Sequence, residues 1–164
     1  MTVLGIDPGY AIVGYAIVKY TGSKFTVVDY GTISTKSEWE FTDRLLHIYK
    51  RLEQIIGEHN IDAMAVEKLF FTTNQKTAMD VAHARGVIML TARIRGAPVF
   101  EYTPLQVKQA VAGYGKAGKK QVTEMTKRLL SLKETPKPDD AADALAVAIC
   151  HCFSSGSLLN KLRG

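Results

Sequence analysis

The sequence predicts an α/β protein built on a five-stranded mixed sheet, in which three antiparallel strands are followed by parallel crossovers. Three apolar runs follow one another at residues 3–7, 12–19 and 24–34, separated only by short breaks that contain Pro, Gly or Ser. Two later apolar runs, at residues 63–66 and 98–102, each follow a segment of helical period. Because a helical crossover returns the chain to the same end of a sheet, these later strands should run parallel to the first.

Helices are expected between and after these strands. Ser37 and Glu40 form a capping-box pattern, and apolar residues then recur at helical spacing to about His59. Further helices are expected at residues 75–95, 104–112, 119–130 and 140–153. This order of strands and helices is that of the ribonuclease H topology.

The last of these helices has sequence signals at both ends. Pro138 cannot continue a helix from the preceding segment, and Asp139 is a favourable N-cap for a helix that starts at Asp140. Ser154-Ser155-Gly156-Ser157 is expected to end it, and the tail from about residue 154 is expected to be frayed.

Length and composition predict one domain, residues 1–164, in the cytoplasm. A chain of 164 residues buries enough surface for an ordinary core. The N-terminus has no basic region before its first acid, and no apolar run reaches the ~18 residues of a membrane span, so neither a signal peptide nor a membrane segment is expected. Cys150 and Cys152 are two positions apart on the last predicted helix, which favours reduced cysteines packed in the core.

Four acidic residues are candidates for one site. Asp7 and Glu67 each end an apolar strand, and Asp140 and Asp143 lie one turn apart at the start of the last helix. If the first and fourth strands are neighbours, all four carboxylates converge, and their repulsion calls for a bound cation. Hard oxygen ligands favour Mg²⁺ or Mn²⁺, and two such ions support phosphodiester hydrolysis without a side-chain nucleophile.

A basic stretch lies close to these acids in the sequence. The chain carries a net charge of +5, and residues 106–137 contain eight cations against Glu124 and Glu134. A charge run alone is usually a solvated face, but beside a metal site it favours binding of a polyanion such as nucleic acid. The lysines of this stretch that we expect to contact such a polyanion are Lys108, Lys116, Lys119 and Lys120.

Several short motifs resemble those of the RuvC family of crossover junction endodeoxyribonucleases, the bacterial Holliday junction resolvases. The similarity covers the chain to about Phe153. The motifs that carry it are Gly5-Ile6-Asp7-Pro8-Gly9, Val66-Glu67-Lys68-Leu69-Phe70-Phe71, Ala84-Arg85-Gly86, Val107-Lys108-Gln109 and Asp140-Ala141-Ala142-Asp143-Ala144-Leu145-Ala146. The chain departs from the family's usual residues at Lys68 and His83.

The resemblance implies roles for individual residues. Asp7, Glu67, Asp140 and Asp143 would be the catalytic acids that bind Mg²⁺, with two ions per site and Mn²⁺ as a substitute. Lys119 would contact the scissile phosphate, with Lys108 as a second candidate. Phe70 would reach the bases at the branch point, where stacking on an unpaired base is worth ~1–3 kcal/mol.

The expected function is therefore paired symmetric nicking of four-way junction DNA in recombination and repair. Two cuts on a two-fold substrate require a homodimer, and the helix at residues 75–95 is more apolar than one sheet face needs. The resemblance also implies the branch-migration proteins RuvA and RuvB as partners. The alternatives are another ribonuclease H-like nuclease, such as one that processes ribosomal RNA precursors, an actin-like sugar kinase, and a catalytically silent junction-binding protein.

Overall fold

The computed structural model describes residues 1–68 and 75–162, with side chains described for residues 1–68 and 77–155. Its sheet has the strand order β3-β2-β1-β4-β5. The strands are β1 (Thr2–Asp7), β2 (Ile12–Thr21), β3 (Lys24–Ser34), β4 (Ala63–Glu67) and β5 (Val99–Tyr102). β1 to β3 pair antiparallel, whereas β4 is parallel to β1 and β5 is parallel to β4. The predicted mixed sheet is confirmed.

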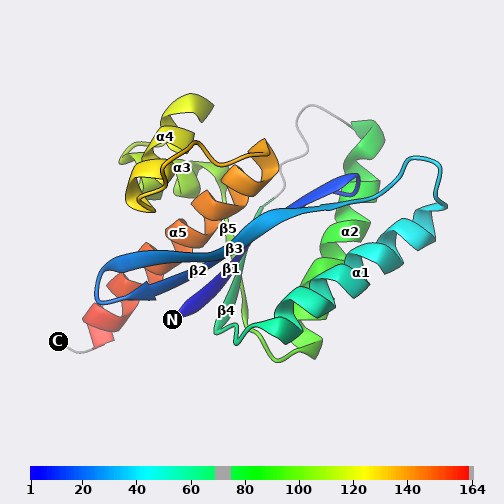
Figure 1. Cartoon of the computed structure of the whole chain (residues 1–164), viewed down its shortest axis with the longest axis horizontal. Coiled ribbons are helices and arrows are strands. Elements are labelled where there is room, and N and C mark those ends of the chain that lie inside the picture. Colours follow the sequence, from blue (N-terminus) through cyan, green and yellow to red (C-terminus); the bar gives the residue numbers. More distant parts are fainter. Residues whose placement is uncertain (69–74, 163–164) are drawn as a thin grey trace.

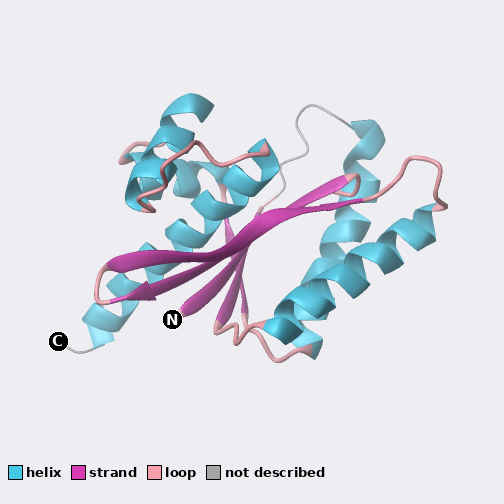
Figure 2. Cartoon of the chain, viewed as in Figure 1, coloured by secondary structure: helices cyan, strands magenta, loops and turns pink. Residues whose placement is uncertain are grey.

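Helices cover both faces of this twisted sheet (Figures 1 and 2). The helices are α1 (Phe41–Glu58), α2 (Gln75–Ile94), α3 (Pro104–Ala112), α4 (Lys119–Leu129) and α5 (Asp139–Leu162). α1 and α2 lie together on one face, and α5, with α3 and α4 beside it, lies on the other (Figure 1). None of the helices in the described ranges is long and apolar enough to span a membrane.

Each face of the sheet has its own core because side chains alternate along a strand. Along β1, Leu4 and Ile6 pack with Ile48 of α1 and Ile88 of α2. Val3 points the other way, into the cluster formed mainly by α5, where Cys150 and Cys152 are buried and unpaired. The prediction that these cysteines are packed in the core is confirmed.

Two glycines allow α5 to lie very close to the sheet. A Cβ atom at Gly5 would stand 2.2 Å from the carbonyl oxygen of Ala144, and one at Gly14 would stand 2.0 Å from that of Asp140. Gly14 is paired with Asp7 across β1 and β2. The first turn of α5 therefore lies directly against the strand pair that ends in Asp7.

The predicted start of α1 is wrong. The helix begins at Phe41 with Glu40 as its N-cap, and no side chain caps it. The hydroxyl of Ser37 instead donates to Glu38, 3.4 Å away. Trp39 packs edge-on against His47 of α1 at 5.1 Å, so the segment before the helix folds back onto it as a turn.

Both predicted ends of α5 are also corrected. Asp139 is the first helical residue, since the carbonyl of Pro138 already accepts from the amides of Ala141 and Ala142. The helix continues through the Ser-Ser-Gly-Ser segment to Leu162. The hydroxyls of Ser154 and Ser155 donate to carbonyls of the preceding turn, an arrangement that lets serine remain inside a helix.

We expect Gly14→Ala to lower the free energy of unfolding by about 1–3 kcal/mol, because the added methyl must push α5 away from β2. Thermal or urea unfolding measures this change. Gly57→Ala in α1 is the control, since its Cβ would approach only the flexible tip of Arg95, at 3.4 Å. That substitution should raise stability through helix propensity. Equal stability of the two variants would contradict the close approach.

Candidate functional site

Two of the four predicted acids end neighbouring parallel strands. Ile6 of β1 is in register with Val66 of β4, so Asp7 and Glu67 follow side by side at the same edge of the sheet. Each sits where its strand leaves the sheet core, and each is partly buried. The sequence prediction that these two carboxylates lie together is confirmed.

The other two acids come from α5. Gly14 holds the Asp140 backbone against the sheet opposite Asp7, and Asp143 lies one turn further along the helix. Acidic side chains in a first turn are also favoured by the helix dipole. The helix therefore brings Asp140 and Asp143 to the edge where Asp7 and Glu67 end their strands.

Lys119, the first residue of α4, supplies the positive charge beside this group. Its ammonium lies 3.2 Å from a carboxylate oxygen of Asp143 and 3.2 Å from one of Asp139. Burial alone would lower the pKa of Lys119, but its bonds to Asp143 and Asp139 outweigh that effect and raise the pKa. Lys119 therefore stays protonated in the site.

The acids lack enough positive charge to be fully ionised. The pKa of Asp7 rises from 3.8 to about 8, mainly because burial removes the carboxyl from water. The negative charges of Glu67, Asp143 and Asp140 raise it as well, in that order. Burial is also the main reason why the pKa values of Glu67 and Asp143 are raised. The whole group would be stabilised by more positive charge.

Two of the four carboxylates, those of Glu67 and Asp143, line a hollow of about 250 Å³, whereas Asp7 and Asp140 do not line it. Glu67, Asp143, Lys119 and Lys108 provide its polar lining, and the rest is apolar. The charges of Lys108 and Lys119 both lower the pKa of Glu67, against the larger effects of burial and Asp143. The hollow thus presents cations and carboxylates to the same space, as a site that binds a phosphate through metal ions must.

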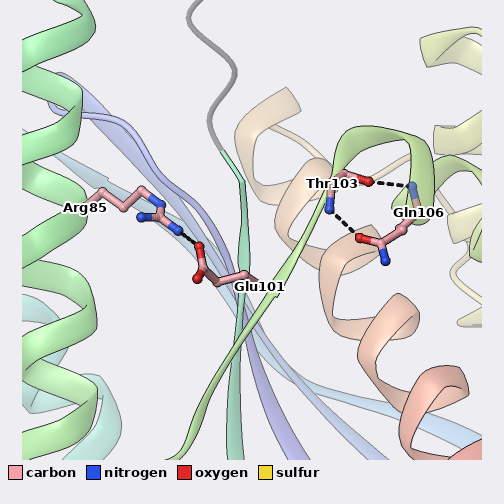
Figure 3. A network of polar contacts seen from close by, with 4 residues as sticks. All are labelled: Arg85, Glu101, Thr103 and Gln106. Carbon is pink, nitrogen blue, oxygen red and sulfur yellow. Dashed lines mark hydrogen bonds and ion pairs between the residues drawn. The ribbon is translucent and has the colours of Figure 1, made fainter.

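Figure 3 shows the start of α3, the helix that carries Lys108. Thr103 follows β5 and caps the helix: its hydroxyl accepts from the Gln106 amide at 3.2 Å, while the Gln106 side chain accepts from the Thr103 amide at 2.8 Å. Arg85 of α2 forms an ion pair with Glu101 of β5 in the same view. The capping contacts thus fix where α3 begins after β5, and the ion pair joins β5 to α2.

The donor set fits a hard divalent cation. All four acids offer carboxylate oxygens, which Mg²⁺ and Mn²⁺ prefer over nitrogen or sulfur. Within residues 1–68 and 77–155, no three His, Cys, Asp or Glu side chains are already gathered as a ready set of ligands. Lys119 holds Asp143 in this state, so the acids are close together but are not arranged around one point.

The remaining predicted contacts are distributed differently. Lys116 is exposed in the segment between α3 and α4, and Lys120, although next to Lys119, lines a separate groove. Phe70 lies outside the described residues. The structure thus places two of the four predicted lysines, Lys108 and Lys119, at the hollow.

Sequence reasoning missed a buried cation near the turn that follows Asp7. Arg44 is 6% exposed, donates to the Thr35 hydroxyl at 2.8 Å and to the Tyr10 hydroxyl, and lies 3.7 Å from the centre of the Tyr10 ring. The Thr35 hydroxyl in turn donates to the Tyr10 carbonyl at 2.8 Å. This cluster holds the turn after Asp7 against α1. Only the apolar spacing of α1, which places Arg44 among core positions, gave any signal of it.

Comparison with known proteins identifies relatives over nearly the whole chain. The family model described as crossover junction endodeoxyribonuclease RuvC matches residues 3–151. The protein of that name from Alkaliphilus metalliredigens is 60% identical over 154 residues, which cover 94% of each chain. The one from Halothermothrix orenii is 58% identical over 151 residues, 92% of each chain.

Solved structures agree with the sequence relatives. Thermus thermophilus RuvC is 36% identical and superimposes with a TM-score of 0.91 over 96% of each chain. The same protein in complex with Holliday junction substrate gives a TM-score of 0.90 over 94% of each chain. A yeast mitochondrial Holliday junction resolvase, 14% identical, shares the fold with a TM-score of 0.70. The chain belongs to the RuvC family of crossover junction endodeoxyribonucleases.

Proposed function

We propose that this protein resolves Holliday junctions, as a homodimer that nicks two DNA strands symmetrically through Mg²⁺-dependent phosphodiester hydrolysis. The observation that carries the proposal is the grouping of Asp7, Asp140, Glu67 and Asp143, of which the last two line a hollow together with Lys119 and Lys108. The Thermus relative in complex with junction substrate supports the choice of DNA. Nothing in the comparisons favours processing of ribosomal RNA or a catalytically silent protein.

In this proposal the four carboxylates hold the metal ions. Two bound Mg²⁺ ions, or Mn²⁺ in their place, supply activation of a water molecule and charge stabilisation at the phosphate and the leaving 3′ oxygen. Such cations would supply the positive charge that the raised pKa values of Asp7, Glu67 and Asp143 call for. The apolar lining of the hollow reduces screening, so each charge there acts more strongly on the phosphate.

Lys119 and Lys108 position the phosphate. An ammonium group has three N–H donors, and Lys119 directs two of them to Asp139 and Asp143. The third donor remains for a phosphate oxygen. Lys108 enters the same hollow from α3 and adds a second positive charge. Both lysines thereby orient the scissile bond over the carboxylates.

The homodimer would form through α2. Met79, Leu90 and Ile94 are 67%, 60% and 60% exposed, and helical spacing places them on one side of the helix. Gly86 lies on the same side with no atom within 4 Å of its Cβ position, which lets a second helix approach closely. Two copies related by a two-fold axis would present two sites to a two-fold junction.

The cellular setting follows from family membership. We expect the enzyme to act in the cytoplasm on junctions formed during DNA recombination and repair. RuvA and RuvB, which move the branch point, are the expected protein partners. Phe70 remains the predicted contact to the bases at that branch point.

Replacing one acid tests the proposed chemistry. Asp7→Asn should reduce nicking of a synthetic four-way junction in Mg²⁺ by about 100-fold or more, since a carboxylate is lost from the metal site. Junction affinity should persist, because no cation is removed from the DNA surface. Asp43→Asn, at an exposed position on α1, is the matched control. Mapped nicks and gel-shift titrations measure the two properties, and wild-type cleavage by Asp7→Asn would overturn the role of Asp7.

The raised pKa of Asp7 predicts how stability depends on pH. Between the ordinary value of 3.8 and about 8, the folded protein binds more protons at this residue than the unfolded chain does. Its contribution to stability is therefore full below pH 4 and falls as pH rises towards 8. In chelator, Asp7→Asn should be more stable than wild type near pH 8, by on the order of a few kcal/mol.

Binding of Mg²⁺ should reverse this order of stability between Asp7→Asn and the wild type. At pH 8, Mg²⁺ should raise the melting temperature of the wild type more than that of Asp7→Asn, because only the wild type gains the full carboxylate set. Melting curves with chelator and with Mg²⁺ make the comparison. If the melting temperature of the wild type depends on neither pH nor Mg²⁺, the assignment of these acids to a metal site is contradicted.

A charge on the exposed face of α2 tests the dimer. Leu90→Glu should convert a dimer to a monomer, since an unpaired charge in an apolar interface is strongly unfavourable. Analytical ultracentrifugation measures the mass. Val28→Glu, at a 47% exposed position on β3, is the control and should leave the dimer intact. A wild type that is monomeric at working concentrations would remove this proposal.

A further inference from the structure

A second surface hollow lies on the other side of the first turn of α4. It has a volume of about 350 Å³ and is lined by Ala112 at the end of α3, by Tyr114 after it, and by Lys120, Glu124, Met125 and Arg128 of α4. Lys119 and Val122 line the candidate site, whereas Lys120 and Gln121 line this groove. The two hollows therefore lie on opposite sides of one helical turn, and residues adjacent in the sequence line different hollows.

The groove combines two cations with an aromatic ring. Arg128 is 69% exposed and donates through Nε to Glu124 at 2.9 Å, which leaves the two terminal nitrogens of its guanidinium directed elsewhere. Lys120 has no recorded ion pair among the described residues. The Tyr114 side chain is 47% exposed, and Ala112 and Met125 add apolar surface. Lys120 and Arg128 together outnumber Glu124, so the groove carries a net positive charge.

Such a surface is suited to a polymer whose backbone alternates negatively charged groups with less polar ones. A duplex arm presents phosphates and deoxyribose sugars along its backbone, whereas its base faces are stacked inside. Phosphates suit Lys120 and Arg128, and sugars suit the Tyr114 ring. Continuity with the candidate site favours DNA over another polyanion, because a strand held at Lys119 is only one residue from Lys120.

We propose that the groove between Tyr114 and Arg128 is an auxiliary DNA contact that holds a junction arm next to the cleavage site. Lys120 and Arg128 bind backbone phosphates, and Tyr114 packs against the sugars between them. The inference deepens the proposed function and rests on it. It assigns this chain an anchoring surface distinct from the carboxylate hollow, built by residues that take no part in the chemistry.

Binding measured at several salt concentrations tests the groove. The double variant Lys120→Ala, Arg128→Ala should bind a four-way junction roughly ten-fold more weakly near 0.1 M salt, and the slope of log affinity against log salt should be shallower by about 2. Tyr114→Ala should also weaken binding but keep the wild-type slope, since it removes no charge. Tyr114→Phe should bind as wild type does. Fluorescence anisotropy in Ca²⁺ or chelator provides the readout, with melting curves to confirm folding.

Lys24→Ala is the control for the loss of a surface cation outside the groove. Lys24 is exposed at the β2–β3 turn, and the register of β2 on β1 places that turn at the opposite end of the sheet from Asp7. It removes one surface cation without touching the groove, so its affinity and slope should stay near those of the wild type. An equal loss in Lys24→Ala and in the double variant would reveal a general charge effect and overturn the proposal.

The remaining outcomes are also decisive. If the double variant and Tyr114→Ala bind junctions with wild-type affinity and slope, the groove is no DNA contact. If they instead lose binding to polyglutamate while DNA binding is intact, the groove takes an acidic protein segment and the proposal is wrong. If the wild type binds junctions through the groove but never nicks them, the proposed function is refuted. The groove would still be a DNA contact in that case.

Discussion

The close contact between the backbone of α5 and the backbones of β1 and β2 determines the rest of the site. Gly5 and Gly14 provide the space, since any larger residue would meet the helix backbone at 2.2 or 2.0 Å. Because Gly14 is paired with Asp7, this contact brings Asp140 to the strand end that carries Asp7. The alanines of α5, buried along its length, keep the same approach over several turns.

That geometry has an electrostatic consequence. Bringing carboxylates together in a partly dry site raises their pKa values, that of Asp7 to about 8. Lys119 relieves part of the repulsion through Asp143, but it also supports Asp139 and therefore cannot neutralise the whole group. A fold that holds this arrangement at neutral pH sacrifices stability for a binding site. The balance is understandable where a cation and a charged substrate complete the charge.

Much of this could be predicted from the sequence, for physical reasons. Strand-ending acids and the Asp-x-x-Asp spacing are local patterns, and Pro138 marks the start of α5 to within one residue. The predicted start of α1 at Ser37 and the predicted end of α5 near Ser154 were wrong, because side-chain hydrogen bonding at these positions depends on neighbours in space. Serine hydroxyls that bond back to carbonyls of the preceding turn carry no sequence signal. Glycines inside strands were a readable signal, since they often mark close backbone approach, and Gly14 was one.

What the sequence predicts least well is which hollow each of two adjacent lysines in α4 lines. Lys119 and Lys120 are adjacent, equally charged and similarly exposed, so composition alone treats them as one basic patch. Their side chains leave the helix about 100° apart, and the capping turn at Gly118 sets which one faces Asp143. One then belongs to the carboxylate hollow and the other to the outer groove. A single helical turn thus separates the lysine proposed to position the scissile phosphate from the one proposed to hold a DNA arm, so a substitution at one position need not disturb the other.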